Sequence, residues 1–146
     1  MDISEIFYSI QGEGKYVGTP ATFVRLGGCN LSCRWCDTKY TWHPDYADYG
    51  QWPMTKIVEE IKKHPARRLV ITGGEPMLQQ KGIEEIRTHF PSYFFEVETN
   101  GSIPLAMKVD TVDHFTISPK LSNSGNRSYD LQLNVENAVY KGRSST

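Results

Sequence analysis

The feature that most constrains the fold of this 146-residue chain is a set of four short apolar runs, each followed by a polar motif. The runs cover residues 21–26, 68–72, 93–97 and 112–117. Strands that alternate with helices or other connections indicate an α/β fold with a parallel sheet, because parallel neighbours need a crossover connection. Ligands of such folds bind beyond the carboxyl ends of the strands. We therefore expect the four polar motifs to form one site.

Three further elements are predicted from local patterns. Alternating residues 3–10 form a strand that leads into a loop with two glycines, Gln11-Gly12-Glu13-Gly14. One helix begins at the cap residue Thr55 and ends near Pro65. A second helix ends before Pro91, and its apolar side is formed by Leu78, Ile83 and Ile86.

Composition and charge exclude several classes of protein. Apolar residues make up 38% of the chain, which allows a packed core, and the length suits a single domain over residues 1–146. Sixteen Lys and Arg against 17 Asp and Glu give a net charge of -1, without the basic excess of a nucleic-acid-binding protein. We expect no secretory leader, because residues 1–5 lack a basic region followed by an apolar run, and the sequence has no apolar stretch long enough to span a membrane. We expect a cytoplasmic protein with no direct nucleic-acid or membrane partner.

The three cysteines, Cys29, Cys33 and Cys36, form a C-x3-C-x2-C array on the loop after residues 21–26. An odd number of closely spaced thiols does not make a disulfide framework, so metal binding in a reducing compartment is expected. Three thiolates on a [4Fe–4S] cluster would leave one iron open for the amine and carboxylate of a bound molecule. The alternative is a structural zinc ion with His43 as the fourth ligand.

Two motifs together resemble the radical S-adenosylmethionine superfamily. The first is the cysteine array with an aromatic residue, Trp35, before its last cysteine. The second is Gly73-Gly74-Glu75-Pro76, which in that superfamily follows the second barrel strand and contacts the methionine part of the cofactor. The pair favours an iron–sulfur cluster over zinc.

A longer ordered set of motifs is similar to the 7-carboxy-7-deazaguanine synthase family of that superfamily. It extends from about residue 3 to about residue 123 and consists of Gln11-Gly12-Glu13-Gly14, Arg25 before Gly-Gly-Cys, Cys36-Asp37-Thr38, Thr72 before Gly-Gly-Glu-Pro, Glu98-Thr99-Asn100-Gly101 and Ser118-Pro119-Lys120. The resemblance implies a lyase that converts 6-carboxy-5,6,7,8-tetrahydropterin to 7-carboxy-7-deazaguanine with loss of ammonia. That reaction belongs to queuosine and deazapurine biosynthesis, a pathway of tRNA modification.

The resemblance also implies three cofactors and a role for each matching residue. A [4Fe–4S] cluster would be bound by Cys29, Cys33 and Cys36, and Mg²⁺ by Thr38. S-adenosyl-L-methionine would be bound by Trp35, Gly73, Gly74, Glu75, Ser118 and Lys120. The pterin would be bound by Gln11, Glu13, Gly14, Arg25, Thr72 and Glu98. The radical would arise on the cofactor, so no side chain is expected to be catalytic in its own right.

The resemblance implies a partial, incomplete β/α barrel of parallel strands, shortened relative to the superfamily core. Members of the family are usually longer, and nothing after Asn126 matches the segment with which they close the pocket. We therefore expect residues 121–146 to be atypical or truncated. An incomplete wall would expose strand edges, which proteins cover or pair, so a homodimer is expected. The radical chemistry also implies an electron donor such as flavodoxin.

Two other functions are compatible with parts of the sequence. A glycyl-radical-enzyme activase is similarly short and shares the cysteine array, although Gln11-Gly12-Glu13-Gly14 and Cys36-Asp37-Thr38 favour the pterin reaction. A non-catalytic metal-binding regulatory domain would have kept the motifs without a closed pocket. Metal analysis separates these classes, because a regulatory zinc domain would hold zinc rather than iron and sulfide.

Overall fold

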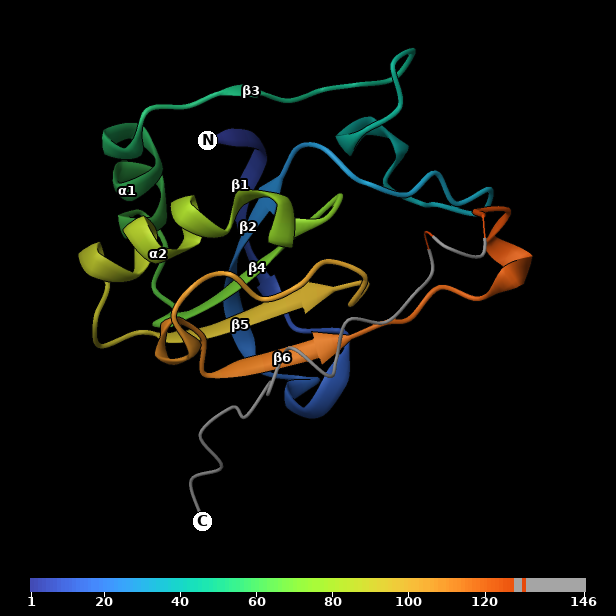
Figure 1. Ribbon diagram of the computed structural model, residues 1–146. Helices are drawn as coiled ribbons and strands as arrows, with labels where there is room; N and C mark the ends of the chain where they lie inside the picture. The colour runs from blue at the N-terminus through green and yellow to red at the C-terminus, as the bar shows by residue number, and fades with distance from the viewer. Residues whose placement is uncertain (128–129, 131–146) are drawn as a thin grey trace.

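The computed structural model describes residues 1–127 and 130, and its centre is one six-stranded sheet with the order β3-β1-β2-β4-β5-β6 (Figure 1). The strands are β1 Asp2–Ile10, β2 Pro20–Leu26, β3 Gly50–Gln51, β4 Arg68–Gly73, β5 Phe94–Thr99 and β6 His114–Ile117. All five strands predicted from the sequence are present, with ends shifted by one or two residues. The mixed α/β class is therefore confirmed.

Four of the strands run parallel, but the two at one side of the sheet do not follow the all-parallel expectation. β2, β4, β5 and β6 pair in parallel, whereas β1 is antiparallel to both β2 and β3. The reason is the short connection between β1 and β2, which holds no α-helix and reverses the chain. A short connection joins antiparallel neighbours, since a parallel pair needs a longer crossover.

Two α-helices cover one face of the sheet, α1 Met54–Lys62 and α2 Gln80–His89 (Figure 1). Their buried isoleucines pack on alternate residues of the central strands, such as Leu69 and Ile71 of β4 and Phe95 and Val97 of β5. The helix ends are close to the prediction, but Pro53 rather than Thr55 occupies the N-cap position of α1, and its side chain makes no capping hydrogen bond. Leu78 is 49% exposed, so it does not belong to the apolar side predicted for the second helix.

The opposite face of the sheet is formed by the other set of alternating residues. A small apolar cluster of Ala21, Phe23 and Val70, with Phe7 against it, occupies part of this face. Two positions further along β2 and β4, the same face carries the polar residues Arg25 and Thr72. On β5 the face carries Glu96 and Glu98. The sheet therefore separates a hydrophobic core on the helical side from a polar face on the other.

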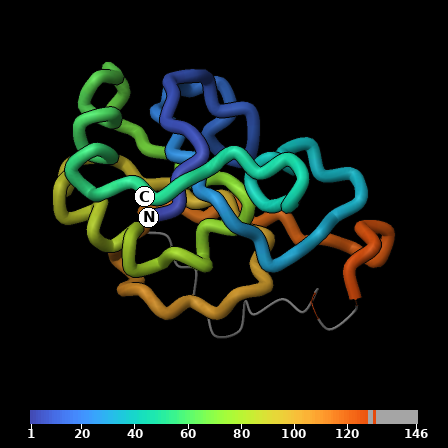
Figure 2. The backbone as a smooth tube through the Cα atoms, turned by 90° about the horizontal axis from the view of Figure 1, so that it is seen from above, coloured from blue at the N-terminus to red at the C-terminus, as the bar shows by residue number. Residues whose placement is uncertain are grey.

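The remaining elements are short 3-10 helices in the loops, η1 Gly14–Tyr16, η2 Lys39–Thr41, η3 Pro76–Gln79, η4 Val109–Thr111 and η5 Ser122–Ser124. Figure 2 shows the segment around η5 beside the loop that follows β2, and the backbone N–H of Arg34 donates to the carbonyl of Ser124. Most of the stretch at 121–146 that we expected to be atypical lies outside the described residues. Of the helices in residues 1–127 and 130, none combines the length and the apolar character needed to cross a bilayer.

Candidate active site

A cavity of about 400 Å³ lies at the carboxyl ends of β2, β4, β5 and β6, and the loop after β1 forms another part of its wall. The cysteine loop, the Gly-Gly-Glu-Pro loop, the Glu-Thr-Asn-Gly loop and the Ser-Pro-Lys segment all meet there, as the parallel strands predicted. The structure brings together at its wall Gln11, Glu13, Arg25, Cys29, Cys33, Trp35, Cys36, Thr38, Thr72, Gly73, Gly74, Glu98, Ser118 and Lys120.

Two residues of the predicted site, Gly14 and Glu75, do not line this cavity. Gly14 begins η1 with a positive φ of 68°, and a Cβ atom there would lie 2.5 Å from Oγ1 of Thr116. Its glycine is required by this close approach and by the left-handed backbone, without any ligand. The structure thus shows a contact of Gly14 with β6, and its predicted contact with the substrate stays a prediction.

The Glu75 carboxylate is fully buried among groups of the protein, and its predicted contact with S-adenosylmethionine stays a prediction. Its Oε1 accepts hydrogen bonds from the hydroxyl of Thr99 at 2.7 Å and the backbone N–H of Met77 at 3.0 Å. Its Oε2 accepts from the backbone N–H of Asn100 at 2.8 Å. Burial raises the pKa of this carboxyl, although the three donors oppose the shift. Glu75 therefore ties the loop after β4 to the loop after β5.

The glycine pair of the same motif allows two loops to pack backbone against backbone. Gly73 has a φ of 132°, and a Cβ atom at Gly74 would overlap the carbonyl oxygen of Gly28. The backbone N–H of Gly74 donates to the carbonyl of Leu26 at 3.1 Å, and that of Glu75 to the carbonyl of Gly28 at 2.9 Å. These contacts hold the Gly-Gly-Glu-Pro loop against the start of the cysteine loop, so both reach the cavity together.

Each cysteine sulfur accepts a hydrogen bond from a neighbouring N–H group. The donors are the backbone of Leu31 to Cys29 at 3.4 Å, the indole Nε1 of Trp42 to Cys36 at 3.3 Å, and the amide Nδ2 of Asn126 to Cys33 at 3.2 Å. Sequence reasoning missed the roles of Trp42 and Asn126. Asn126 follows Cys33 by 93 residues, and nothing in its local sequence indicates that it approaches the cysteine loop.

This donor set fits an iron–sulfur cluster better than a single zinc ion. In the part of the chain that the structure describes, no three His, Cys, Asp or Glu side chains are grouped closely enough to hold one metal ion. A [4Fe–4S] cluster offers a separate iron to each thiolate, and its sulfurs commonly receive N–H hydrogen bonds. His43, the proposed zinc ligand, does not line the cavity, and its Nδ1 accepts from the backbone N–H of Asp45 at 3.3 Å.

Burial also affects the protonation of Cys29, the first residue of the cysteine array. It raises the pKa of the Cys29 thiol to about 11, and the nearby carboxylate of Glu75 adds a smaller upward effect. A thiol with this pKa stays protonated at neutral pH in the absence of metal. Metal binding by such a group releases a proton, because the ligand form is the thiolate.

The adjacent part of the cavity carries a guanidinium held by a carboxylate. Nε of Arg25 donates to Oε1 of Glu5 at 2.8 Å, and the same oxygen accepts from the hydroxyl of Tyr40 at 3.0 Å. Burial raises the pKa of Tyr40, so it remains a hydrogen-bond donor at neutral pH. Among the described residues these contacts use Nε of Arg25 and leave its two Nη groups for a ligand carboxylate.

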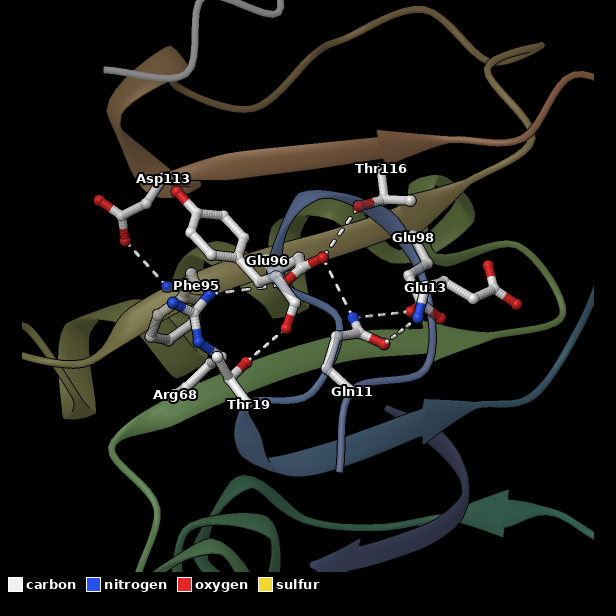
Figure 3. Close-up of polar contacts among 10 residues, drawn as sticks. Gln11, Glu13, Thr19, Arg68, Phe95, Glu96, Glu98, Asp113 and Thr116 are labelled. Atoms are coloured by element: carbon white, nitrogen blue, oxygen red, sulfur yellow. Dashed lines mark hydrogen bonds and ion pairs between the residues drawn. The ribbon is translucent and has the colours of Figure 1, made fainter. Parts of the chain in front are cut away.

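The amide of Gln11 links the loop after β1 to β5 (Figure 3). Its Nε2 donates to one oxygen of Glu98 at 3.0 Å and to one of Glu96 at 3.1 Å, and its Oε1 accepts from the backbone N–H of Glu13 at 3.1 Å. Gln11 is 1% exposed, so its polar atoms are occupied by the protein although the residue lines the cavity. Glu98 and Glu13 are thus held by one amide.

One cation and two hydroxyl groups complete the wall near the cysteine loop. Nζ of Lys120 donates to the hydroxyl of Ser118 at 2.8 Å and lies 5.5 Å from the centre of the Trp35 ring. The Thr38 hydroxyl lies 3.6 Å from the sulfur of Cys36. Hydroxyl and ammonium groups at this position can bind the polar parts of a nucleoside and an amino acid, and a threonine oxygen is a ligand type that Mg²⁺ accepts.

Comparison with known proteins finds one family model and several related enzymes that match this chain. A family described as a 4Fe-4S single cluster domain matches residues 10–104. The chain is 38% identical over 141 residues to 7-carboxy-7-deazaguanine synthase of Bacteroides thetaiotaomicron, a match that covers 97% of this chain and 71% of the relative. The enzymes of the same name from Haemophilus influenzae and Pyrobaculum aerophilum are 40% and 42% identical. These two matches cover 82% and 84% of this chain but only 53% and 56% of the relatives.

A solved structure has the same fold. The crystal structure of QueE from Escherichia coli superimposes with a TM-score of 0.72 and 29% sequence identity, covering 94% of this chain and 68% of that protein. The chain therefore spans between about half and about seven tenths of the length of the proteins that it matches.

Proposed function

Because the chain belongs to the 7-carboxy-7-deazaguanine synthase family, we propose that it is a radical S-adenosylmethionine lyase of queuosine and deazapurine biosynthesis. Its substrate would be 6-carboxy-5,6,7,8-tetrahydropterin and its products 7-carboxy-7-deazaguanine and ammonia. The observation that carries this proposal is a cavity whose wall joins the three cysteines at one part to Arg25, Thr72 and Glu98 at another.

The cysteine loop fits the iron–sulfur cluster of this family. Cys29, Cys33 and Cys36 would hold it, with the N–H groups of Trp42 and Asn126 directed at two of their sulfurs. The cluster and S-adenosylmethionine supply the radical chemistry when they are bound. The chain itself positions the reactants and restricts the access of water.

The cavity wall offers matching groups for the other ligands. Ser118, Lys120, Trp35 and the backbone of the glycine pair would bind S-adenosylmethionine. Arg25 would bind the pterin carboxylate through its free Nη groups, and Thr38 would contribute one oxygen to Mg²⁺, whose remaining ligands would be water and that carboxylate. Glu13 and Glu98 are acceptors for the donor-rich edge of the pterin, and Thr72 supplies a hydroxyl.

Further parts of the proposal concern the assembly. We propose that the six-stranded sheet is a partial barrel, that the chain forms a homodimer, and that an electron donor such as flavodoxin serves it in the cytoplasm. Within residues 1–127 and 130, β6 pairs with β5 alone, so its other edge has no strand partner there. This supports the homodimer, because proteins usually cover or pair an exposed strand edge. Sedimentation at micromolar concentration tests this assembly, and a monomer would contradict it.

The activity is tested by anaerobic reconstitution with iron and sulfide, followed by addition of reductant, S-adenosylmethionine, Mg²⁺ and the pterin. Mass spectrometry should detect 7-carboxy-7-deazaguanine. The product should disappear when the pterin is omitted and in the Cys33→Ala variant, whose thiol lines the cavity. Formation of 5′-deoxyadenosine without the pterin product would contradict the substrate and favour a protein partner. One zinc per chain with no iron would contradict the enzyme function.

A further inference from the structure

A second acidic residue of β5, Glu96, lies two positions before Glu98 on the same face of the strand and is fully buried. Figure 3 shows its carboxylate surrounded by donors from three other elements. Oε1 accepts from the hydroxyl of Thr116 on β6 at 2.8 Å and from the amide of Gln11 at 3.1 Å, and Nη1 of Arg68 on β4 lies 3.4 Å from Oε2. Glu96 does not line the cavity.

The countercharge for Glu96 is itself held in place. The guanidinium of Arg68 lies against two neighbouring aromatic rings, 4.1 Å from the centre of Tyr16 and 3.9 Å from that of Phe94. These two contacts attract the cation and limit its contact with water. A buried ion pair of this kind gives little net stability, since apolar residues of the same volume serve a fold equally well or better. The ion pair of Glu96 and Arg68 is therefore better explained by the side chain that the hydrogen bonds of Glu96 orient.

Those hydrogen bonds orient the amide of Gln11. Both protons of its Nε2 are directed at carboxylates, one to Glu96 and one to Glu98. A half-turn of the amide would direct its oxygen at both carboxylates and its NH₂ group at the backbone N–H of Glu13, so three attractive contacts would become repulsive. Glu96 thereby sets the only favourable orientation of the amide among the described residues.

We propose that Glu96 is a positioning residue for the pterin: through Gln11 it holds the Glu98 carboxylate and the Glu13 backbone in place, and Arg68 balances its charge. This inference rests on the proposed function, in which Glu13 and Glu98 bind the donor edge of the pterin. It goes beyond that function because Glu96 contacts no ligand and acts on the site through an amide.

The test is a double-mutant cycle on the reconstituted holoenzyme with S-adenosylmethionine and Mg²⁺ present. The readout is the dissociation constant of 6-carboxypterin, the oxidised form of the substrate, measured by its fluorescence. Glu96→Gln removes the charge that balances Arg68 and introduces an NH₂ group among donors. We expect it to raise the dissociation constant about tenfold, and to raise it no more than about twofold when Glu98→Gln is already present. The affinity for S-adenosylmethionine should not change.

A matched control is Asp113→Asn. Asp113, a partly buried carboxylate beside β5, also pairs with an arginine: it accepts from the backbone N–H of Phe95 at 2.8 Å and lies 3.2 Å from Nη1 of Arg87. It does not line the cavity. This variant should lower the midpoint of unfolding and leave pterin binding unchanged.

If Glu96→Gln does not fold, Gln11→Met replaces it in the cycle. The thioether retains the length of the side chain and leaves Glu96 its contacts with Thr116 and Arg68, but it removes the link to Glu98. We expect the same tenfold rise, again absent in the Glu98→Gln background.

The inference is overturned if the loss of affinity is equal in both backgrounds, if affinity does not change, or if Asp113→Asn weakens pterin binding as much as Glu96→Gln does. These results require a wild-type protein that binds 6-carboxypterin. A wild-type protein that does not bind it would overturn the proposed function and this inference with it.

Discussion

Replacing Glu75 with Gln is expected to lower the free energy of unfolding and to leave the affinity for S-adenosylmethionine nearly unchanged. The carboxylate is fully buried, accepts three hydrogen bonds and does not line the cavity. The substitution keeps the size of the side chain and changes one acceptor oxygen into an NH₂ group. The variant therefore distinguishes a Glu75 that holds two loops together from a Glu75 that contacts the cofactor.

The expected magnitude follows from the three donors. The oxygen of Gln can still accept from the N–H of Met77 and the hydroxyl of Thr99, but its NH₂ group then faces the N–H of Asn100, which lies 2.8 Å from Oε2 of Glu75. A lost hydrogen bond to a buried charged group costs about 1.5–3 kcal/mol. The variant no longer buries a charge, which offsets part of this loss, since burial raises the pKa of the wild-type carboxyl. The net expectation is about 1–2 kcal/mol.

Anaerobic urea unfolding, followed by tryptophan fluorescence, measures this difference. With a slope of about 2 kcal/mol per molar urea, the midpoint should fall by about 0.5–1 M at constant slope. The matched control is Glu60→Gln, because Glu60 hydrogen-bonds Lys63 at the surface of α1 and should leave the midpoint unchanged. Equilibrium binding of S-adenosylmethionine to the reconstituted variant completes the measurement.

An unchanged midpoint combined with a tenfold or greater loss of affinity for S-adenosylmethionine would refute the reasoning. In that case the Glu75 carboxylate would have to turn into the cavity and bind the cofactor directly. A lower midpoint with unchanged affinity supports the role as a tie between the loops after β4 and β5.

Two further expectations concern the cluster and the pH dependence of stability. Trp42→Phe removes the N–H that lies 3.3 Å from the sulfur of Cys36, and this should lower the reduction potential of the cluster by about 50 mV in an EPR-monitored redox titration. An unchanged potential would show that the indole does not affect the cluster. Burial lowers the pKa of His114 below 6.5, so its contribution to stability is present above the unfolded pKa and is lost as the pH falls. The variant His114→Phe keeps a ring beside Tyr16 but cannot bind a proton. In urea unfolding it should lose less stability than the wild type between about pH 7 and pH 5. An equal loss of stability in both proteins would contradict this role of His114.

The strands and the place of the site could be predicted from the sequence because both depend on local patterns. The apolar runs 21–26 and 68–72 become β2 and β4, and the glycines after them mark the ends of the strands. Parallel strands place their carboxyl ends at one edge, so the cysteine array and Gly73-Gly74-Glu75-Pro76 had to meet. The direction of β1 was not predicted, because it depends on the short connection to β2 rather than on the residues of the strand itself.

The orientation of individual side chains was decided by contacts between segments that are far apart in the chain. The motif alone does not show that Glu75 turns inward, since the groups that attract it are Thr99 and Asn100 on another strand and loop. The motif of Gln11 likewise does not show that its amide donates to Glu96 and Glu98, 85 and 87 residues away. Spacing along the chain determines which residues share a face of a strand or a loop. Which of them face the cavity, and which hold the others in place, is decided only when the strands assemble and each buried polar group must find a partner.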